Sequence, residues 1–215
     1  VIFFFLNSLK QNQKLIVVWN SLEEDLVGEF YDYFEKIENL SFVTESKNSI
    51  KYSGNGSDLN LDIIDYSQLY PTPSVIEKIM IEKNKINGND YIAIHVRRTD
   101  MHKLYNLRRK KFDRNYNSFR LFIKQNPGKK LFLATDNIDT YRYFYNNYGS
   151  ILINKDHNFV ETDERRQTTT FDSVVDLFMC IGASKFLGTE LSSFTEFILK
   201  NRRFDSKCCK ETEYV

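Results

Sequence analysis

Residues 91–100, YIAIHVRRTD, hold the side chains best suited to chemistry, because an apolar run leads directly into a histidine, two arginines and an aspartate. The apolar run at 91–94 has no helical period and follows turn-forming residues at 87–90, so it predicts a buried β-strand. In open α/β sheets, ligands bind beyond the carboxyl ends of the strands. Four polar residues of this stretch are therefore predicted to lie at a ligand site: His95, Arg97, Arg98 and Asp100.

Two other predicted strands also end in polar clusters, Thr135-Asp136-Asn137 and residues 188–193 (GTELSS). In a parallel sheet the carboxyl ends of the strands meet at one edge, so the three clusters are expected to lie together. They combine a guanidinium fork for phosphates, hydroxyls and backbone amides at a helix start, and carboxylates for a ribose or a base. This set matches the needs of a nucleoside diphosphate, although polar loops after strands are also ordinary and no single cluster would decide it.

The elements that must position these clusters alternate between strand and helix from residue 91 onward, which predicts a parallel sheet with right-handed crossovers. Predicted strands lie at 91–96, 130–134, 150–154 and 185–188, and predicted helices at 115–125, 138–148, 171–181 and 192–199. Upstream, the patterns predict helices at 1–10, 22–37 and 73–85 and strands at 14–19 and 40–44. A boundary near residue 86 separates this smaller α/β lobe from the regular one.

The charge balance offers no global field for steering nucleic acid or an anionic membrane, because 30 Lys and Arg stand against 29 Asp and Glu and give a net charge of +1. Any anion site must therefore be local. The basic run at 108–111 (RRKK) lacks interleaved stacking aromatics, so it predicts a solvated face or a contact with an anionic acceptor rather than a nucleic-acid site.

Membrane and metal signals are weak in this sequence. The opening apolar residues 1–6 are too short to span a bilayer and predict core, so we expect a soluble chain without a transmembrane segment. The three cysteines form neither a disulfide framework nor a metal spacing, which favours a reducing, cytoplasmic setting over the secretory lumen. No His/Cys cluster or paired carboxylate predicts a metal site.

Three segments carry a resemblance to a known family. IHVRRTD, FLATD and FDSVVDLFMCIGASKFLGTELSSFTEFI resemble, in order, the three motifs of the GDP-fucose-dependent fucosyltransferases, a superfamily that includes α1,2-, α1,6- and protein O-fucosyltransferases. The match covers most of residues 91–199. One such motif would be weak, but three in the right order are fairly specific.

The resemblance implies an α/β, GT-B-like fold with two Rossmann-like lobes. Residues 1–86 would be an incomplete acceptor-side lobe and residues 87–215 the lobe that binds the nucleotide sugar. It also implies an inverting, metal-independent glycosyltransferase without a cofactor, whose partners are a GDP-sugar donor and a carbohydrate acceptor. The family begins with a strand and a glycine-rich loop, whereas this chain begins in the following helix, so either the pocket lacks one wall or an upstream part is missing.

The resemblance also implies roles for individual residues. Arg97 would grip the diphosphate and be essential, while Arg98 would support it. The remaining donor contacts would come from His95 and Asp136 near the ribose or guanine, Asp176 at the guanine amines, and Thr189, Ser192 and Ser193 at phosphate oxygens. Two alternatives stay open, since His95 could be a satisfied core histidine and Asp176 could be an exposed or capping residue.

One departure from the family concerns the general base. The α1,6 branch has a lysine directly after the aspartate of the first motif and a glutamate a few residues later, whereas Met101 follows Asp100 here. The base is therefore unassigned, with Asp100 and His102 as candidates. The missing glutamate also leaves a second hypothesis open: a catalytically degenerate relative that binds a nucleotide or a glycan without turnover.

Overall fold

The computed structural model describes residues 15–18, 30–37, 40–43, 69–86, 90–98, 115–154, 167–204 and 212–214. The chain forms two compact units, Val1–Ser74 and Val75–Val215. Helix α3 (Pro73–Asn84) therefore groups almost entirely with the second unit, whereas the sequence patterns place the boundary near residue 86. The expected helix at 1–10 lies outside the described residues.

The first unit contains a parallel pair of short strands, β1 (Leu15–Val18) and β2 (Leu40–Val43). Between them lies one helical turn, α2 (Phe30–Tyr33). The predicted helix at 22–37 is wrong at its carboxyl end, because Phe34 forms an antiparallel bridge with Pro71. Pairing with another segment draws the backbone out of the helix there.

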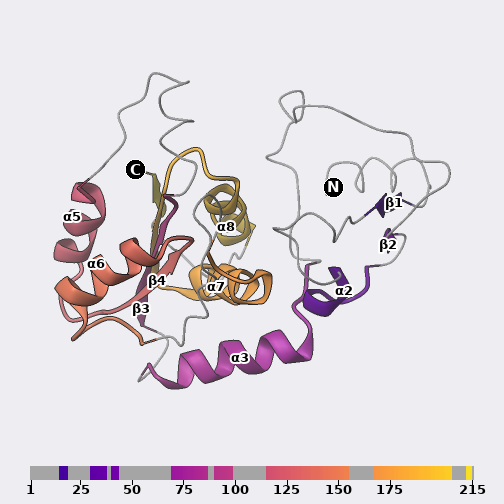
Figure 1. The fold of residues 1–215 in the computed structure, drawn as a ribbon, viewed down its shortest axis with the longest axis horizontal. Coiled ribbons are helices and arrows are strands. Elements are labelled where there is room, and N and C mark those ends of the chain that lie inside the picture. Colours follow the sequence, from indigo (N-terminus) through magenta and orange to yellow (C-terminus); the bar gives the residue numbers. More distant parts are fainter. Residues whose placement is uncertain are drawn as a thin grey trace. The chain divides into compact units, whose positions relative to one another are not determined.

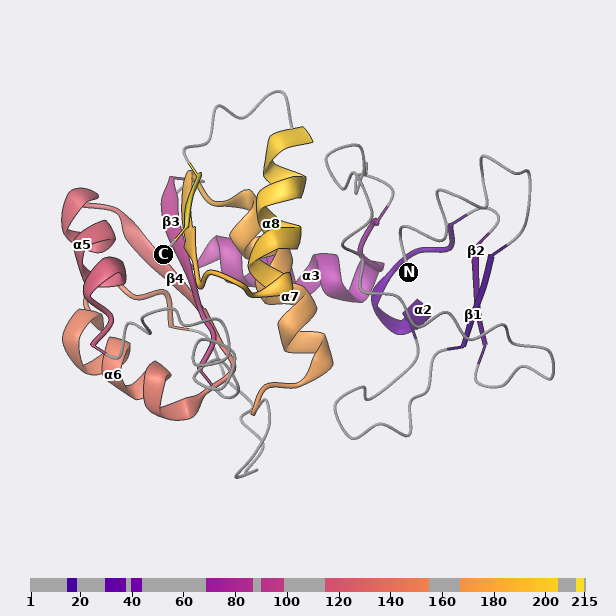
Figure 2. The same cartoon turned by 90° about the horizontal axis from the view of Figure 1, so that it is seen from above.

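The second unit is built on a parallel sheet with the strand order β4-β3-β5-β6. Its strands are β3 (Tyr91–Val96), β4 (Lys130–Thr135), β5 (Lys185–Gly188) and β6 (Thr212–Tyr214). The helices that follow β3 are α5 (Asn117–Gln125), α6 (Ile138–Tyr148), α7 (Thr170–Gly182) and α8 (Ser193–Phe204). Helices α5 and α6 cover one face of the sheet, and α7 and α8 cover the other (Figures 1 and 2). The predicted α/β alternation is thus confirmed.

None of the helices that the structure describes is long and apolar enough to cross a membrane.

The predicted strand at 150–154 is reduced to an isolated parallel bridge between Leu131 and Leu152, in which the Leu131 N–H donates to the carbonyl of Ile151 and the Ile153 N–H to that of Leu131. The backbone amides of Ile151 and Leu152 both donate to the carbonyl of Tyr148, at 3.0 and 2.9 Å. The chain is therefore still turning out of α6 when it reaches the edge of the sheet. Strand β6, in contrast, was not predicted, because its three residues are too few to show a period.

Side chains along β3 alternate between the two faces of the sheet, as the strand period of two requires. Ile92, Ile94 and Val96 belong to the core that also contains residues of α5 and α6. On the other face, the Tyr91 hydroxyl donates to the carbonyl of Met179 in α7 at 2.7 Å. All six residues of β3 are buried, so this strand is the centre of the sheet and its end is fixed in position.

The strand order also defines where a ligand is expected. From β3 the chain crosses to β4 on one side, and later returns to place β5 on the other side of β3. The connections leave in opposite directions at this point, and in open α/β sheets ligands bind at such a switch point, beyond the carboxyl ends of the strands. The polar residues after β3 and β5 lie at this switch point.

Arg202 of α8 holds the carboxyl end of α7 against β5. Its Nη1 donates to the carbonyls of Cys180, Ile181 and Ala183 at 3.1, 2.9 and 2.7 Å, and its Nη2 lies 3.3 Å from the carbonyl of Ser184. These carbonyls have no partner within a helix, and a cation there also interacts favourably with the helix dipole. Arg202 is 2% exposed, so these hydrogen bonds are shielded from solvent.

We expect Arg202→Met to lower the free energy of unfolding by about 2 to 4 kcal/mol, because several buried carbonyls lose a charged donor. Arg202→Lys should lose less, since an ammonium can still reach some of them. Urea unfolding measures both, with Arg120→Met on the exposed side of α5 as the matched control. An Arg202→Met variant as stable as the control would contradict this role.

Candidate functional site

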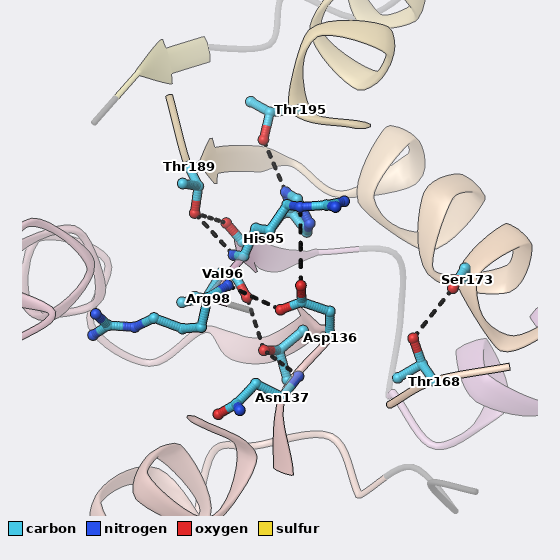
Figure 3. Close-up of polar contacts among 11 residues, drawn as sticks. His95, Val96, Arg98, Asp136, Asn137, Thr168, Ser173, Thr189 and Thr195 are labelled. Carbon is cyan, nitrogen blue, oxygen red and sulfur yellow. Dashed lines mark hydrogen bonds and ion pairs between the residues drawn. The ribbon is translucent and has the colours of Figure 1, made fainter. Parts of the chain in front are cut away.

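Thr189 fastens the end of β3 to β5. Its backbone N–H and its hydroxyl both donate to the carbonyl of His95, at 2.9 and 3.0 Å, and the hydroxyl accepts the backbone N–H of Arg97 at 3.0 Å (Figure 3). Both donors of Thr189 are therefore in use. The phosphate contact expected of Thr189 stays a prediction, and it would require one of these hydrogen bonds to break.

Asp136 holds the same stretch from the β4 side. Its Oδ1 accepts the backbone N–H of Arg98 at 2.9 Å, and its Oδ2 lies 3.9 Å from Nε of Arg97 (Figure 3). The Asp136 side chain is 6% exposed, whereas the Arg97 side chain is 30% exposed. A buried carboxylate thus lies beside a guanidinium that still reaches solvent, and a guanidinium is a suitable group for binding an anion.

The segment before α7 also joins this edge of the sheet. The backbone N–H of Gln167 donates to the carbonyl of Asp136 at 3.0 Å, and the Gln167 side chain accepts the backbone N–H of Ile138 at 2.8 Å. Thr169 and Asp172 then cap α7, because the Thr169 hydroxyl accepts the Asp172 N–H at 3.0 Å and donates to its carboxylate at 2.8 Å. The starts of α6 and α7 are therefore tied together beside Asp136.

Ser192 directly precedes α8 and carries an unsatisfied buried hydroxyl. The residue is 4% exposed, and its Oγ has no hydrogen-bond partner among the residues that the structure describes. Leaving such a group unpaired costs about 1 to 3 kcal/mol. The preceding Leu191 has a left-handed backbone with φ 64°, so the loop is also strained. Ser193 is exposed in the first turn of α8.

Gly188 allows α8 to approach β5 very closely. A Cβ at this position would lie 2.4 Å from Cγ2 and 2.6 Å from Oγ1 of Thr195, so any larger residue would push the helix away. The close approach brings the amino end of α8 next to the end of β5. The glycine therefore positions the helix terminus, whose free N–H groups favour an anion.

His95 is enclosed between β3 and α8. Its Nδ1 lies 2.8 Å from the Thr195 hydroxyl, and its ring centroid is 4.5 Å from that of Phe194. Burial, and secondly the charge of Arg97, lower the pKa of His95 to about 3. The ring is therefore neutral at pH 7 and positions α8 without contributing a positive charge. The expected contact of His95 with the ribose or guanine stays a prediction.

Asp176 lies in the middle of α7 and is 3% exposed. The alternative that it is an exposed or capping residue is therefore wrong, since Thr169 and Asp172 do the capping. A buried carboxylate on a helix that packs on β3 and β4 is unusual. Its expected role at the guanine edge stays a prediction.

Arg98 points away from this cluster. Its side chain extends away from His95 and Thr189 (Figure 3), and its guanidinium carbon lies 3.9 Å from the ring centroid of Tyr116. Asp100 and His102, the candidates for the general base, lie outside the described residues. Within the residues that are described, no group of three or more His, Cys, Asp or Glu could hold a metal ion.

Three residues of this site were missed by the sequence patterns. Thr195 and Tyr116 stand inside or beside predicted helices, where they look like ordinary helix residues, and Gln167 lies in a polar segment without a pattern. Thr195 had one available signal, because it follows the cluster GTELSS by only two residues. Nothing in the sequence marks Tyr116 or Gln167.

The sequence matches no protein-family model and no curated protein. Among solved structures, the fold is similar to the α-1,6-fucosyltransferase NodZ, at a TM-score of 0.56 for the form co-crystallized with GDP and 0.53 for the form soaked with GDP-fucose. A structure of NodZ from Bradyrhizobium matches at a TM-score of 0.54. Each is 11% identical, and each alignment covers 91% of this chain and 84–85% of NodZ. The expected α/β, GT-B-type, fucosyltransferase-like fold is therefore confirmed.

The buried His95 predicts a dependence of stability on pH. Because the pKa of His95 is about 3 in the folded protein and 6.5 when unperturbed, the unfolded chain takes up the proton first as the pH falls. The stability that the neutral His95 contributes is complete above pH 6.5. It is lost towards pH 3, at about 1.4 kcal/mol of unfolding free energy per pH unit. Between pH 7.5 and 5, the wild type should thus lose about 2 kcal/mol that His95→Asn does not lose. Urea unfolding at both pH values measures this, and equal losses in the two proteins would contradict it.

Proposed function

We propose that this protein is an inverting, metal-independent glycosyltransferase that moves L-fucose from GDP-fucose to a glycan hydroxyl. The observation that carries the proposal is a partly exposed guanidinium beside a buried carboxylate, at the switch point of a fucosyltransferase-like fold. Arg97, held by Asp136, supplies the charge. The amino end of α8, with the unsatisfied hydroxyl of Ser192 directly before it, supplies neutral donors.

The character of this site supports a diphosphate as its ligand. A guanidinium matches two phosphate oxygens with a planar fork, which an ammonium cannot do. A bound phosphate would also give the buried Ser192 hydroxyl the partner that the described residues do not provide. Since the net charge of the chain is only +1, the attraction for an anion must come from this edge and not from the protein as a whole.

The carboxylates near the site support a guanine nucleotide. Guanine presents an N–H and an amino group on one edge, for which a carboxylate is the natural acceptor. Asp176 is the candidate that the third motif supplies, and it is 3% exposed in the middle of α7. The proposal that the donor is GDP-fucose also rests on the three ordered motifs at 91–199 and on the fucosyltransferase-like fold.

The proposed reaction is a direct displacement at the anomeric carbon. The acceptor oxygen forms a bond to C1 of the fucose while the bond from C1 to the β-phosphate oxygen breaks, so the configuration at C1 inverts and GDP leaves. Arg97 and the amino end of α8 would stabilise the negative charge that develops on the leaving phosphate. The proton of the acceptor hydroxyl passes to a base, for which Asp100 and His102 remain the candidates.

Binding of GDP tests the site directly. We expect Arg97→Met to weaken GDP binding by about 10- to 100-fold, the loss for one hydrogen-bonded charge, which corresponds to about 1.5 to 3 kcal/mol. Arg97→Lys should recover part of this loss, because the charge remains but the fork does not. Isothermal titration measures each affinity, with Arg120→Met as the exposed control. Absence of GDP binding by the folded wild type would refute the proposal, as would an Arg97→Met variant with unchanged affinity.

Turnover separates the enzyme from a binding module. The wild type should release GDP from GDP-fucose, faster in the presence of an accepted oligosaccharide, and equally fast with EDTA. The product should have the opposite anomeric configuration, which NMR identifies. A protein that binds GDP tightly but releases none from GDP-fucose over a panel of oligosaccharides would instead be the degenerate relative. Inhibition by EDTA would contradict the metal-independent mechanism.

A further inference from the structure

The two adjacent arginines of the site lie on opposite faces of the sheet. In β3, the His95 side chain lies against α8, whereas Val96 belongs to the core under α5 and α6. Continuing the alternation, Arg97 turns to the Asp136 carboxylate and Arg98 to Tyr116. Figure 3 shows Arg98 extending away from His95. The two guanidinium groups therefore have different contacts.

Tyr116 is a fixed support for the Arg98 guanidinium. Its ring stacks on Tyr143 with centroids 4.5 Å apart, and meets Phe144 edge-on at 5.2 Å. Its hydroxyl lies 3.2 Å from the Thr140 hydroxyl. All three partners belong to α6, so the ring that carries Arg98 is anchored in the core of the second unit.

The backbone of Tyr116 is strained. Its φ of 56° and ψ of 28° place it in the left-handed region, which is rare for a bulky residue. Its side chain does not cap α5, so the strain is not repaid by a helix cap. Such conformations persist where the surrounding contacts fix them, and they cluster at functional sites. Among the described residues, α6 and Arg98 contact the Tyr116 side chain.

We propose that Arg98 and Tyr116 are a pair of positioning residues for the anion site. The stacked pair fixes the backbone at Arg98, whose N–H holds Asp136, and Asp136 in turn directs Arg97. This inference rests on the proposed function for its ligand, GDP. Arg98 acts through Asp136 and Arg97 and does not contact the ligand itself.

The same pair joins the two ends of one stretch of sequence. Arg98 directly precedes residues 99–115, which include Asp100 and His102, and Tyr116 directly follows them. The contact fixes the distance between the residues on either side of this stretch. Arginine suits this role better than lysine, because its planar guanidinium stacks on an aromatic face.

A double-mutant cycle on GDP affinity tests the positioning role. Arg98→Met and Tyr116→Leu should each weaken GDP binding by about 3- to 10-fold. The double variant should bind GDP no more weakly than the single variant with the lower affinity, because the two substitutions remove the same contact. Tyr116→Phe keeps the ring and should bind GDP within about twofold of the wild type. Additive losses, or a loss in Arg98→Met far above that in Tyr116→Leu, would overturn the proposal in favour of direct contact between Arg98 and the ligand.

Trypsin digestion of the folded protein tests the contact without GDP. Residues 103–114 contain the basic run RRKK and lie between Arg98 and Tyr116. Cleavage by trypsin there therefore reports on the contact between the two residues. Both single variants should be cut at least fivefold faster within 103–114, with other sites unchanged. An unchanged rate would refute the contact, and faster cleavage throughout the chain would mean that the pair only stabilises the fold. If the wild type failed to bind GDP, the proposed function would fall, while the digestion would still decide the contact.

Discussion

The site depends on one constraint, the fixed position of the backbone where β3 ends. Thr189, after β5, donates to the carbonyl of His95 and accepts the amide of Arg97, and Asp136, after β4, accepts the amide of Arg98. Two neighbouring strands thus hold the residues that leave the sheet. Because the main chain is fixed from both sides, the alternation of the strand continues beyond its last residue, and Arg97 and Arg98 acquire different surroundings from their position alone.

Burial decides what the polar groups at this edge can do. His95 is within a strand end that the sequence suggests for ligand binding, but it is enclosed by α8 and kept neutral, so it holds the helix in place. Similarly, the backbone N–H and the hydroxyl of Thr189 both donate to a main-chain carbonyl. Ser192 is the contrasting case, since it is buried and its hydroxyl is unsatisfied among the described residues. The distinction between support and ligand contact therefore lies in the hydrogen bonds that each group already makes.

The sequence predicts the second unit well because its strands are apolar runs and its helices are amphipathic, and both signals are local. It overestimates residues 150–154, where the apolar segment pairs with β4 at a single bridge. It fails at Phe34, where pairing with Pro71 stops a helix that the period would continue. Site residues were predicted where strand ends carry a motif. Tyr116 was not, because a left-handed backbone at a tyrosine comes from tertiary contacts that no local pattern records.

A protein with a net charge of +1 would have to create any affinity for an anion locally, and the proposed site uses very few charges to do so. A single guanidinium exposed to solvent would attract an anion only weakly, because water and salt screen it. Holding Arg97 against a buried carboxylate restricts its direction, and placing it at the edge that also bears the amino end of α8 adds neutral donors that need no counter-charge. A second arginine pointing to the same ligand would add charge but also repulsion. In the proposed site, Arg98 lies on an aromatic ring instead, where it would make the backbone more rigid and so lower the conformational entropy that Arg97 loses on binding.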